Sequence, residues 1–514
     1  MRIVFRVDAS NEIGTGHVVR CMILGQSLRS RDADIVFICR DHRGNLAALI
    51  EEAGFSVRML PAARQSTAEE NGYSAWLGTT QRSDAEQTIS ALSGACADWM
   101  VVDHYALDEQ WERLMRPHAK GIVAIDDLAN RMHACDVLLD QNYGANAGDR
   151  YAKLIPDACR SLLGPRYALL NRAYSGRTPR VRRQVERVLV YFGGVDRCNA
   201  TGLALEALSA PELANLPVDV VIGAQNPHRE AISAASAGRG ATVIHGALPH
   251  LADLMAEADL AIGAAGTTTW ERLCLGLPSI VVVLAANQRP GAEALAADEI
   301  IDYAGPLDAV TPDVLRARIV RLVDDSSELE RLSRAGPLVV DGLGAERMAE
   351  TMLPSAAEEL RLRPMAVSDA ALLFGWVNEP EVRRQSLKRE PVGWADHVAW
   401  FSSRPGSARC HIFILETPAG LPVGQIRFDL LDGGQVRLSY LLDPLVRGRR
   451  WAARLVTLGI EELGKRGCFE IRAEVRVENA ASRRVFERLE FETGVSNDGL
   501  HIYTTTTRNF GRRA

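Results

Sequence analysis

The sequence predicts an α/β protein in which two parallel, helix-covered sheets are followed by a smaller α+β domain. Strand-like and helix-like segments alternate from the first residue to about residue 350, as they do in parallel sheets covered by helices. The alternation breaks at a polar stretch near 175–186, and the order of elements changes from about Leu360. With 514 residues the chain is too long for one hydrophobic core, and its length favours about three domains.

The first predicted domain covers residues 1–175 and is Rossmann-like. Its candidate strands are short and rich in Val, Ile and Phe, and they lie at 2–8, 34–39, 55–60, 98–103 and 121–126. A helix is predicted from about His17 to Arg29, because positions 18, 21, 22 and 25 repeat at helical spacing.

The second predicted domain, residues 187–355, repeats this pattern with strands at 187–192, 217–222, 241–245, 259–263 and 279–284. The stretch before it, which includes Arg180-Val181-Arg182-Arg183, lacks apolar periodicity and is expected to be a solvated linker. Two Rossmann-like domains that share a cleft form the GT-B architecture, in which ligands bind at the carboxyl ends of the strands.

The third predicted domain, residues 360–510, has a mixed order of elements. Two helices come first (369–378 and 394–402), then strands at 411–416, 422–430 and 434–442, and then a helix, strand, helix and strand at 449–466, 469–475, 479–489 and 499–507. Antiparallel strands followed by alternating elements indicate an α+β domain.

The composition excludes several classes of protein. A net charge of −6 does not favour a nucleic-acid or anionic-membrane partner, since both require concentrated Lys and Arg. The nine scattered cysteines, none in a Cys-x-x-Cys pair, argue against a disulfide framework and a structural zinc site, and no required metal is predicted. The first residues read as a strand rather than a signal peptide, and no apolar run approaches the ~20 residues of a membrane span. A cytoplasmic location is expected.

The first candidate site is Gly14-Thr15-Gly16-His17, between the first strand and its helix. Glycines there let backbone N–H groups approach an anion, and a helix N-terminus favours negative charge, so a diphosphate is the expected ligand. His17 is suited to proton transfer beside it. The alternative is a tight turn with a plain helix-start residue.

The second candidate site is the turn at Gly266-Thr267-Thr268. Its N–H groups and hydroxyls suit a diphosphate, and Glu271, one helical turn later, is placed to accept both hydroxyls of a ribose. A carboxylate there is also a good helix cap, which is the alternative. Asn287-Gln288 and Gly194 follow other strands and are expected on the same rim.

Together these motifs resemble the UDP-sugar hydrolase of pseudaminic acid biosynthesis, which releases UDP from UDP-2,4-diacetamido-2,4,6-trideoxy-β-L-altropyranose with water as acceptor. The motifs that carry the resemblance run in order through about residues 1–350: Arg6-x-Asp8, Gly14-Thr15-Gly16-His17-x-x-Arg20, Asp103-His104-Tyr105, Asp126-Asp127-Leu128, Gly164-Pro165-x-Tyr167-x-x-Leu170, Phe192-Gly193-Gly194-x-Asp196 and Gly266-Thr267-Thr268-x-x-Glu271-x-x-x-x-Gly276-Leu277-Pro278, followed by Asn287-Gln288.

The resemblance implies that the second domain holds UDP while the first presents water to the anomeric carbon. His17 matches the family's active-site histidine. Asp103 and Tyr105 are further catalytic candidates, beside His104 and Asp127, although a role in fixing loops suits all four equally.

A third motif, Arg447-Gly448-Arg449-Arg450-Trp451-Ala452, follows a strand that ends at Leu442 and opens a helix. With Asn479 after the next strand, it resembles the pyrophosphate loop of GCN5-related N-acetyltransferases (GNAT), which implies acetyl-CoA as co-substrate. Arg450 stands where the family has its first loop glycine. It could add a phosphate contact, but it could also prevent close backbone approach. Asn479 is near the pantetheine arm in that family and could equally be a helix N-cap.

The segment with Asn378, Arg383 and Ser386, followed by His397-x-x-Trp400, resembles the substrate side of acetyltransferases that modify UDP-4-amino-sugars. Its aromatic residues could equally belong to the core. Tyr440, Glu474 and a bound water are candidate bases.

The two resemblances fit together, because the product of the acetyltransferase is the substrate of the hydrolase. The sequence therefore predicts a bifunctional enzyme that acetylates N4 of UDP-4-amino-4,6-dideoxy-N-acetyl-β-L-altrosamine and then releases UDP. A related legionaminic-type sugar stays open. The alternatives are a GT-B glycosyltransferase with a sugar or lipid acceptor, and a C-terminal module that binds acetyl-CoA without catalysis.

Overall fold

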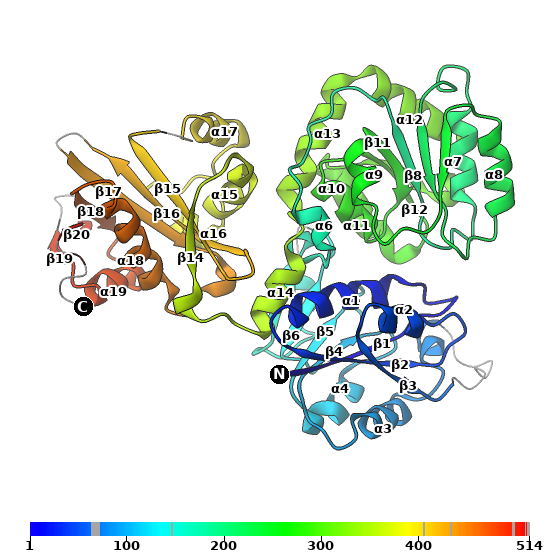
Figure 1. The fold of residues 1–514 in the computed structure, drawn as a ribbon, viewed down its shortest axis with the longest axis horizontal. Helices are drawn as coiled ribbons and strands as arrows, with labels where there is room; N and C mark the ends of the chain where they lie inside the picture. The colour runs from blue at the N-terminus through cyan, green and yellow to red at the C-terminus, as the bar shows by residue number, and fades with distance from the viewer. Residues whose placement is uncertain are drawn as a thin grey trace. The chain divides into compact units, whose positions relative to one another are not determined.

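The computed structural model describes residues 1–62, 72–144, 147–404, 407–431, 434–495, 499–508 and 510, and it divides into two compact units, Met1–Met352 and Leu353–Ala514. The first unit contains two parallel sheets and the second a mixed sheet, each covered by helices (Figure 1). The predicted pair of Rossmann-like sheets followed by an α+β domain is confirmed. No helix in these ranges is long and apolar enough to cross a membrane.

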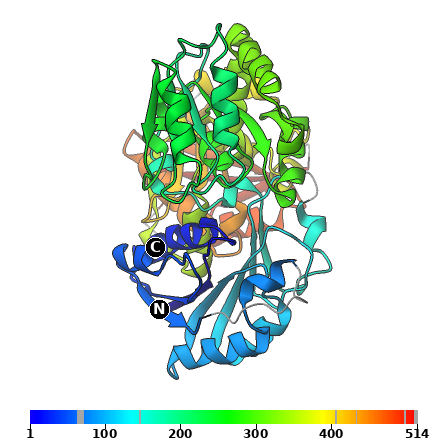
Figure 2. The same ribbon diagram turned by 90° about the vertical axis from the view of Figure 1, so that its right-hand side faces the viewer.

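The first sheet has seven parallel strands in the order β3-β2-β1-β4-β5-β6-β7. The strands are β1 (Arg2–Val7), β2 (Asp34–Arg40), β3 (Ser56–Leu60), β4 (Ala97–Asp103), β5 (Ala119–Ile125), β6 (Val137–Asp140) and β7 (Arg160–Leu163). The sequence did not predict β6 and β7, each of which has four residues. Helices α1 (Gly16–Arg29) and α2 (Ala47–Glu52) lie on one face, and α3 (Gln81–Leu92) and α4 (Glu109–Met115) on the other (Figures 1 and 2).

The second sheet has the order β10-β9-β8-β11-β12-β13, in which the direction of strand addition reverses between β8 and β11. Its strands are β8 (Val188–Tyr191), β9 (Val218–Val221), β10 (Thr242–His245), β11 (Leu260–Ala264), β12 (Ser279–Val283) and β13 (Asp302–Pro306). The edge strand β13 was not predicted because it contains Gly and Pro, which resemble a turn.

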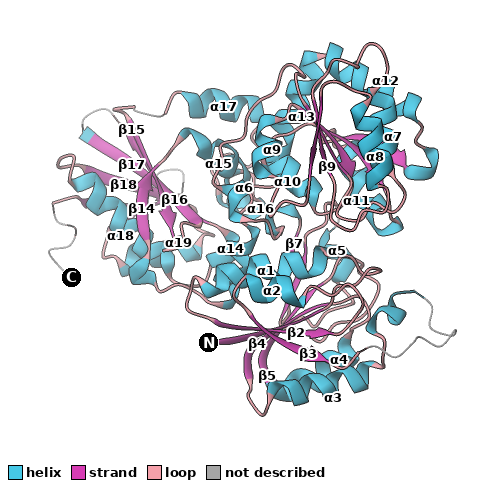
Figure 3. Ribbon diagram, turned by 45° about the vertical axis from the view of Figure 1, so that its right-hand side comes forward, coloured by secondary structure: helices cyan, strands magenta, loops and turns pink. Residues whose placement is uncertain are grey.

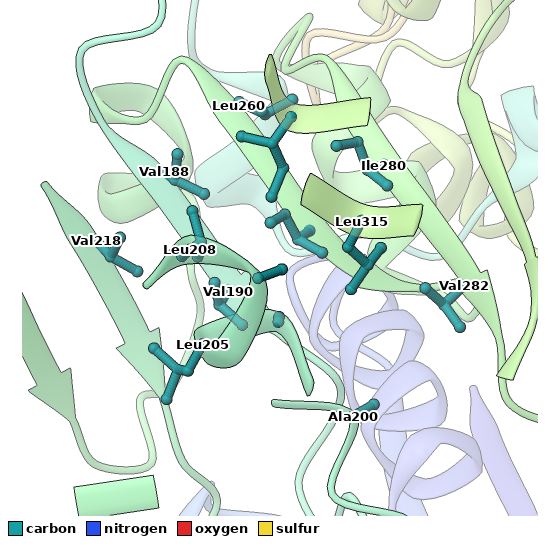
Figure 4. Packing of buried hydrophobic residues seen from close by; sticks show 14 of the residues in the cluster. Val188, Val190, Ala200, Leu205, Leu208, Val218, Leu260, Ile280, Val282 and Leu315 are labelled. Carbon is teal, nitrogen blue, oxygen red and sulfur yellow. The ribbon is translucent and has the colours of Figure 1, made fainter. Parts of the chain in front are cut away.

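Both faces of this sheet are buried at its central strands. Val188 and Val190 pack with α7 (Ala200–Leu208) and α12 (Pro312–Asp324), as Figure 4 shows, whereas Leu189 belongs to the cluster on the other face. That second cluster includes residues of α6 (Arg172–Ser175), α9 (Ala252–Glu257), α10 (Thr268–Cys274) and α11 (Arg289–Ala297). Continuous apolar strands follow from burial on both sides.

The last helix of the first unit returns to the first sheet. After α13 (Ser326–Val339), helix α14 (Gly344–Met352) packs against α1, with hydrogen bonds from Ser27 to Glu346 (3.3 Å) and from Trp99 to the carbonyl of Met352 (3.0 Å). The chain therefore crosses between the two sheets a second time before the unit ends.

The expected solvated linker is wrong at Arg182, whose side chain is buried with 2% exposure. Its guanidinium donates to the carbonyls of Met255 (2.8 Å), Ala258 (3.0 Å) and Leu275 (2.5 Å). Arginine has enough N–H donors to satisfy several carbonyls at helix ends, so an arginine-rich run need not be solvated.

The sheet of the second unit has the order β14-β15-β16-β17-β18-β20-β19, and only β17 and β18 pair in parallel. The strands are β14 (Arg361–Pro364), β15 (Cys410–Glu416), β16 (Pro422–Leu430), β17 (Gln435–Leu442), β18 (Glu470–Val475), β19 (Glu492–Val495) and β20 (His501–Thr506). Helix α18 (Trp451–Gly464) packs on Ile426 and Phe428, and α15 (Ala370–Val377) and α17 (Trp394–Ser402) pack around Ile414 (Figure 3). Two further helices of this unit are α16 (Pro380–Gln385) and α19 (Ala480–Arg488).

Candidate active sites

A cavity of about 210 Å³ in the first unit brings the two glycine turns together. Both turns follow the strands at which strand order reverses in their sheets, β1 and β11, where open α/β sheets bind ligands. The predicted residues that line the cavity are Gly14, Thr15, Gly16, His17, Tyr105, Asp127, Gly266, Thr267, Asn287 and Gln288.

His17, at the start of α1, is paired with Asp103, the last residue of β4. Its Nδ1 lies 2.7 Å from Oδ1 of Asp103. Burial on its own would raise the pKa of Asp103, but Arg20 and His17 outweigh it and hold that pKa well below its usual range. The ionised carboxylate cannot donate, so it accepts the hydrogen of Nδ1, and in the neutral imidazole Nε2 is the acceptor. This arrangement prepares His17 to act as a general base.

Arg20 connects this pair to the other polar residues at the same strand ends. Its Nε donates to Oδ2 of Asp103 (2.6 Å), and Nη1 donates to Oδ2 of Asp127 (2.7 Å), which also accepts from the hydroxyl of Tyr105 (2.8 Å). Burial and the nearby Asp127 raise the pKa of Tyr105 well above its usual range, so its hydroxyl stays protonated. Asp103 is fully buried and lies behind His17 rather than on the cavity wall.

An aromatic cluster that sequence reasoning missed surrounds His17. The rings of Tyr73 and Trp76 pack against Tyr105 at centroid distances of 5.0 and 5.7 Å, and the Tyr105 ring lies edge-on to the imidazole at 4.7 Å. Tyr73 and Trp76 belong to a short 3-10 helix (Gly72–Leu77) that carries no recognisable motif. The density of aromatic residues in Gly72-Tyr73-Ser74-Ala75-Trp76 was the one available signal.

In the second glycine turn, Thr269 and Trp270 join Gly266 and Thr267 on the cavity wall. The amide of Gln288 is held by a hydrogen bond from the backbone N–H of Leu284 to Oε1 (3.1 Å), which leaves its NH₂ group beside Gly266. The following helix α10 has only seven residues, so hydroxyls and N–H groups, rather than a helix dipole, are what this turn offers an anion.

The other predicted UDP residues, Gly194, Thr268 and Glu271, are not on the cavity wall. Glu271 is partly buried, and burial raises its pKa to about 7, while a hydrogen bond from Tyr174 acts in the opposite direction. The hydroxyl of Tyr174 also accepts from the backbone N–H of Leu251 (3.0 Å). Tyr174 thereby holds the carboxyl of Glu271 in place.

In the second unit the expected pyrophosphate loop lies between β17 and α18. Gly448 has φ +82° and Arg450 has φ +63°, so Arg450 takes the left-handed conformation that favours glycine. The Arg449 guanidinium lies 5.4 Å from the centre of the buried Trp451 ring. Arg447 pairs with Glu379 at 2.7 Å. The turn keeps its shape with arginine at position 450, at a conformational cost of about 1–2 kcal/mol.

Strands β17 and β18 separate next to this loop. They pair only from Gln435–Glu470 to Arg437–Arg472, although β17 continues to Leu442 and β18 to Val475. The hydroxyl of Tyr440 donates to Oγ of Ser482 (3.0 Å), and the side chain of Asn479 accepts from the N–H of Ser482 (3.1 Å). Asn479 is therefore an N-cap of α19, which is the second of the two roles that the sequence predicts for it.

The expected substrate-side residues bind their own loop in this structure. The amide of Asn378 makes two hydrogen bonds with the backbone of Val392, at 2.8 and 3.0 Å. Arg383 donates to Oγ of Ser386 (3.2 Å), whose hydroxyl donates to the carbonyl of Val382 (2.6 Å). His397 is buried and hydrogen-bonded to the carbonyl of Ala370, which makes it part of the core. Their polar groups shape the segment between α16 and α17.

Comparison with known proteins agrees with this division. Residues 359–492 match the acetyltransferase (GNAT) domain family. The chain is 21% identical over 510 residues to an uncharacterized protein of Methanocaldococcus jannaschii, with 96% of this chain and 97% of that protein covered. It is 26% identical over 196 residues to the UDP-2,4-diacetamido-2,4,6-trideoxy-beta-L-altropyranose hydrolase of Campylobacter jejuni, with 38% of this chain and 61% of that protein covered.

A further relative is the spore coat polysaccharide biosynthesis protein SpsG of Bacillus subtilis, 21% identical over 365 residues, with 70% of this chain and 100% of SpsG covered. Among solved structures, MurG of Acinetobacter baumannii has a TM-score of 0.49 at 14% identity, covering 68% of this chain and 98% of MurG. The C-terminal region thus carries a GNAT acetyltransferase domain, and the N-terminal region resembles the Campylobacter hydrolase and SpsG.

Proposed function

We propose that the protein is a bifunctional nucleotide-sugar enzyme of pseudaminic acid biosynthesis. Its GNAT domain acetylates the 4-amino group of UDP-4-amino-4,6-dideoxy-N-acetyl-β-L-altrosamine with acetyl-CoA. Its N-terminal unit hydrolyses the product, UDP-2,4-diacetamido-2,4,6-trideoxy-β-L-altropyranose, and releases UDP. The observation that carries the proposal is the His17–Asp103 pair, at 2.7 Å, whose histidine lies on the wall of a cavity that the second glycine turn also lines.

In the hydrolysis, Nε2 of His17 takes a proton from water while the water oxygen bonds to the anomeric carbon. The bond between that carbon and the diphosphate oxygen breaks, and UDP departs. Asp103 stabilises the imidazolium that forms, since it stays ionised beside it. N–H groups and hydroxyls of the Gly266 turn stabilise the charge that grows on the diphosphate.

In the acetylation, the sugar amine attacks the thioester carbonyl of acetyl-CoA, the C–S bond breaks, and the amine loses a proton while the thiolate gains one. The N–H groups of Gly448 and Arg450 and the start of the 14-residue α18 suit the pyrophosphate. Burial raises the pKa of Tyr440 to about 12. Tyr440 therefore keeps its proton at neutral pH and is suited to donate it to the thiolate rather than to act as a base.

The proposal is tested by incubating the full-length protein with the UDP-4-amino-sugar, with and without acetyl-CoA, and identifying products by mass spectrometry. We expect an acetylated UDP-sugar and then free UDP, both only when acetyl-CoA is present. Release of UDP only when a sugar or lipid acceptor is added would instead make the N-terminal unit a glycosyltransferase. Binding of acetyl-CoA without turnover of any amine would make the C-terminal unit a non-catalytic module.

A further inference from the structure

A buried arginine lies inside the second glycine turn. Arg272, on α10, is 1% exposed and donates to the carbonyl of Ala264 (2.9 Å) and to Oγ1 of Thr269 (3.0 Å). A Cβ on Gly263 would lie 2.6 Å from Nη1 of Arg272 and 2.5 Å from the carbonyl oxygen of Tyr191, so the turn needs glycine at this position. The guanidinium is thus fixed directly beneath the turn.

The charge of Arg272 is not balanced by an ion pair among the described residues. Its Nε is buried without a hydrogen-bond partner there. The neighbouring Glu271 offsets the charge only in part, because burial raises the pKa of that carboxyl to about 7 and leaves it about half protonated at neutral pH. Burial also lowers the pKa of Arg272, to about 10, which leaves it charged.

The buried arginines of the first sheet are different, since each has carboxylate partners. Arg6 pairs with Asp8 and Asp84 at 2.6 Å, and Arg20 pairs with Asp103 at 2.6 Å and Asp127 at 2.7 Å. Burying a cation without an anion is costly, and Arg182 meets this cost with backbone carbonyls away from the cavity wall. Arg272 differs because it lies directly behind that wall, where an anionic ligand can supply the missing charge.

The cavity lies one side chain away from Arg272. Thr269, whose hydroxyl accepts from the guanidinium, is on the cavity wall together with Gly266 and Thr267. A charge in such a poorly hydrated setting acts on an anion several ångströms away far more strongly than an exposed charge does. Only an anionic part of the ligand gains from it.

We propose that Arg272 is the electrostatic anchor for the diphosphate of the nucleotide, acting from beneath the turn through Thr269 rather than by direct contact. This inference rests on the proposed UDP site and adds a positioning residue to it. In this arrangement Arg272 recognises the charge of the diphosphate, and other residues recognise the nucleoside.

The experiment measures binding of UDP and uridine to the full-length protein by calorimetry or NMR at pH 8, where Glu271 is mostly ionised. Three variants are compared with the wild type: Arg272→Met, Arg272→Lys and, as a matched control, Arg289→Met. Arg289 is the first residue of α11. Its side chain is 59% exposed and pairs with Glu293 on the same helix, so its charge is screened by solvent.

We expect Arg272→Met to weaken UDP binding roughly 10- to 100-fold while uridine binding changes less than about threefold, because only the diphosphate loses a partner. Arg272→Lys keeps the charge and should keep most of the preference for UDP over uridine, which still tests the idea if Arg272→Met does not fold. An equal loss of UDP and uridine binding in both Arg272 variants would reduce Arg272 to a structural role. A loss of UDP binding in Arg289→Met as large as in Arg272→Met would also overturn the inference, whereas a wild type that binds neither ligand would overturn the proposed function itself.

Discussion

The hydrogen bond between His17 and Asp103 decides which imidazole nitrogen is free. Asp103 lies 86 residues further along the chain and is held by Arg20 as well, so its orientation does not depend on the histidine alone. A base that is oriented by a fixed carboxylate is ready to accept a proton without rearrangement.

We therefore expect His17→Ala to lower the rate of UDP release about 100-fold or more, because a positioned proton acceptor is lost. UDP binding should stay within about twofold, since the diphosphate contacts are unchanged. Steady-state kinetics and calorimetry on the same preparation measure both quantities. Turnover close to that of the wild type would remove His17 from the mechanism.

Asp103→Asn is the companion variant, since it keeps the size of the side chain but lets an amide N–H face Nδ1. The imidazole then favours the tautomer with its hydrogen on Nε2, which cannot accept a proton. A loss of roughly 10²- to 10⁴-fold in kcat is expected, within the range that such a change causes in other histidine–aspartate pairs. The thermal unfolding temperatures of the variant and the wild type are compared to check whether the weaker pair with Arg20 has also lowered the stability of the fold.

The raised pKa of Glu271, about 7, predicts a pH dependence for nucleoside binding if this residue is part of the proposed site. If the ionised carboxyl accepts the ribose hydroxyls, uridine affinity should rise between pH 6 and pH 8 by up to about tenfold, as the ionised fraction grows. Uridine is used because it carries no phosphate that titrates in this range. Glu271→Gln should show weaker and pH-independent binding, and a flat profile for the wild type would return Glu271 to helix capping.

Turns next to regular elements supply the proposed phosphate-binding groups of both units. In the proposed acetyl-CoA loop, the left-handed backbone at Arg450 shows that the turn geometry does not require glycine, although a non-glycine residue there is strained. The guanidinium at this position is exposed, where it can meet a phosphate.

Two substitutions separate these effects. Arg450→Gly should be more stable than Arg450→Ala by about 1 kcal/mol, because alanine keeps the strain of a positive φ and glycine does not. This reverses the order expected at an ordinary helical position. Both should raise the KM for acetyl-CoA several-fold, since both lose the guanidinium. Urea unfolding and initial rates measure the two effects, and equal stability of the variants would show that the backbone conformation at position 450 carries no strain.

Helix α14 ties the end of the first unit to the helix that carries His17 and Arg20. Ala345, Met348, Ala349 and Met352 are almost fully buried, and each buried methionine contributes about 1.5–3 kcal/mol. We expect a fragment of residues 1–340 to unfold at a lower temperature than one of residues 1–355 and to lose UDP release. Calorimetric scans of the two fragments compare them directly. Equal melting temperatures would mean that α14 is dispensable.

In the molecule as a whole, each compact unit has its own buried core and its own candidate site. Residues 1–355 alone should therefore hydrolyse the diacetamido UDP-sugar without acetyl-CoA, and residues 356–514 should consume acetyl-CoA only with the 4-amino precursor. Joining the two raises the local concentration of the shared intermediate. If the N-terminal fragment folds and binds UDP but cleaves the sugar only after the C-terminal half is added back, the two activities are not independent.

The sequence by itself determined the fold class and the places of the three turns. Alternating apolar segments and glycines next to strands are local signals, so they can be read without knowing what the segments pack against. Strand β13 was missed because its Gly and Pro resemble a turn, and the four-residue β6 was missed as well.

Only the tertiary structure decided how side chains far apart in the chain are used. The order of the strands places Asp103 behind His17, and packing brings Tyr73 and Trp76 to the same site. Packing also buries Arg182 among helix ends and leaves Arg272 without an ion pair among the described residues. It also engages Asn378, Arg383 and Ser386 in shaping their own loop. Hydrogen bonds and desolvation depend on atoms that meet across tens or hundreds of residues, and a periodic pattern along one segment contains no information about them.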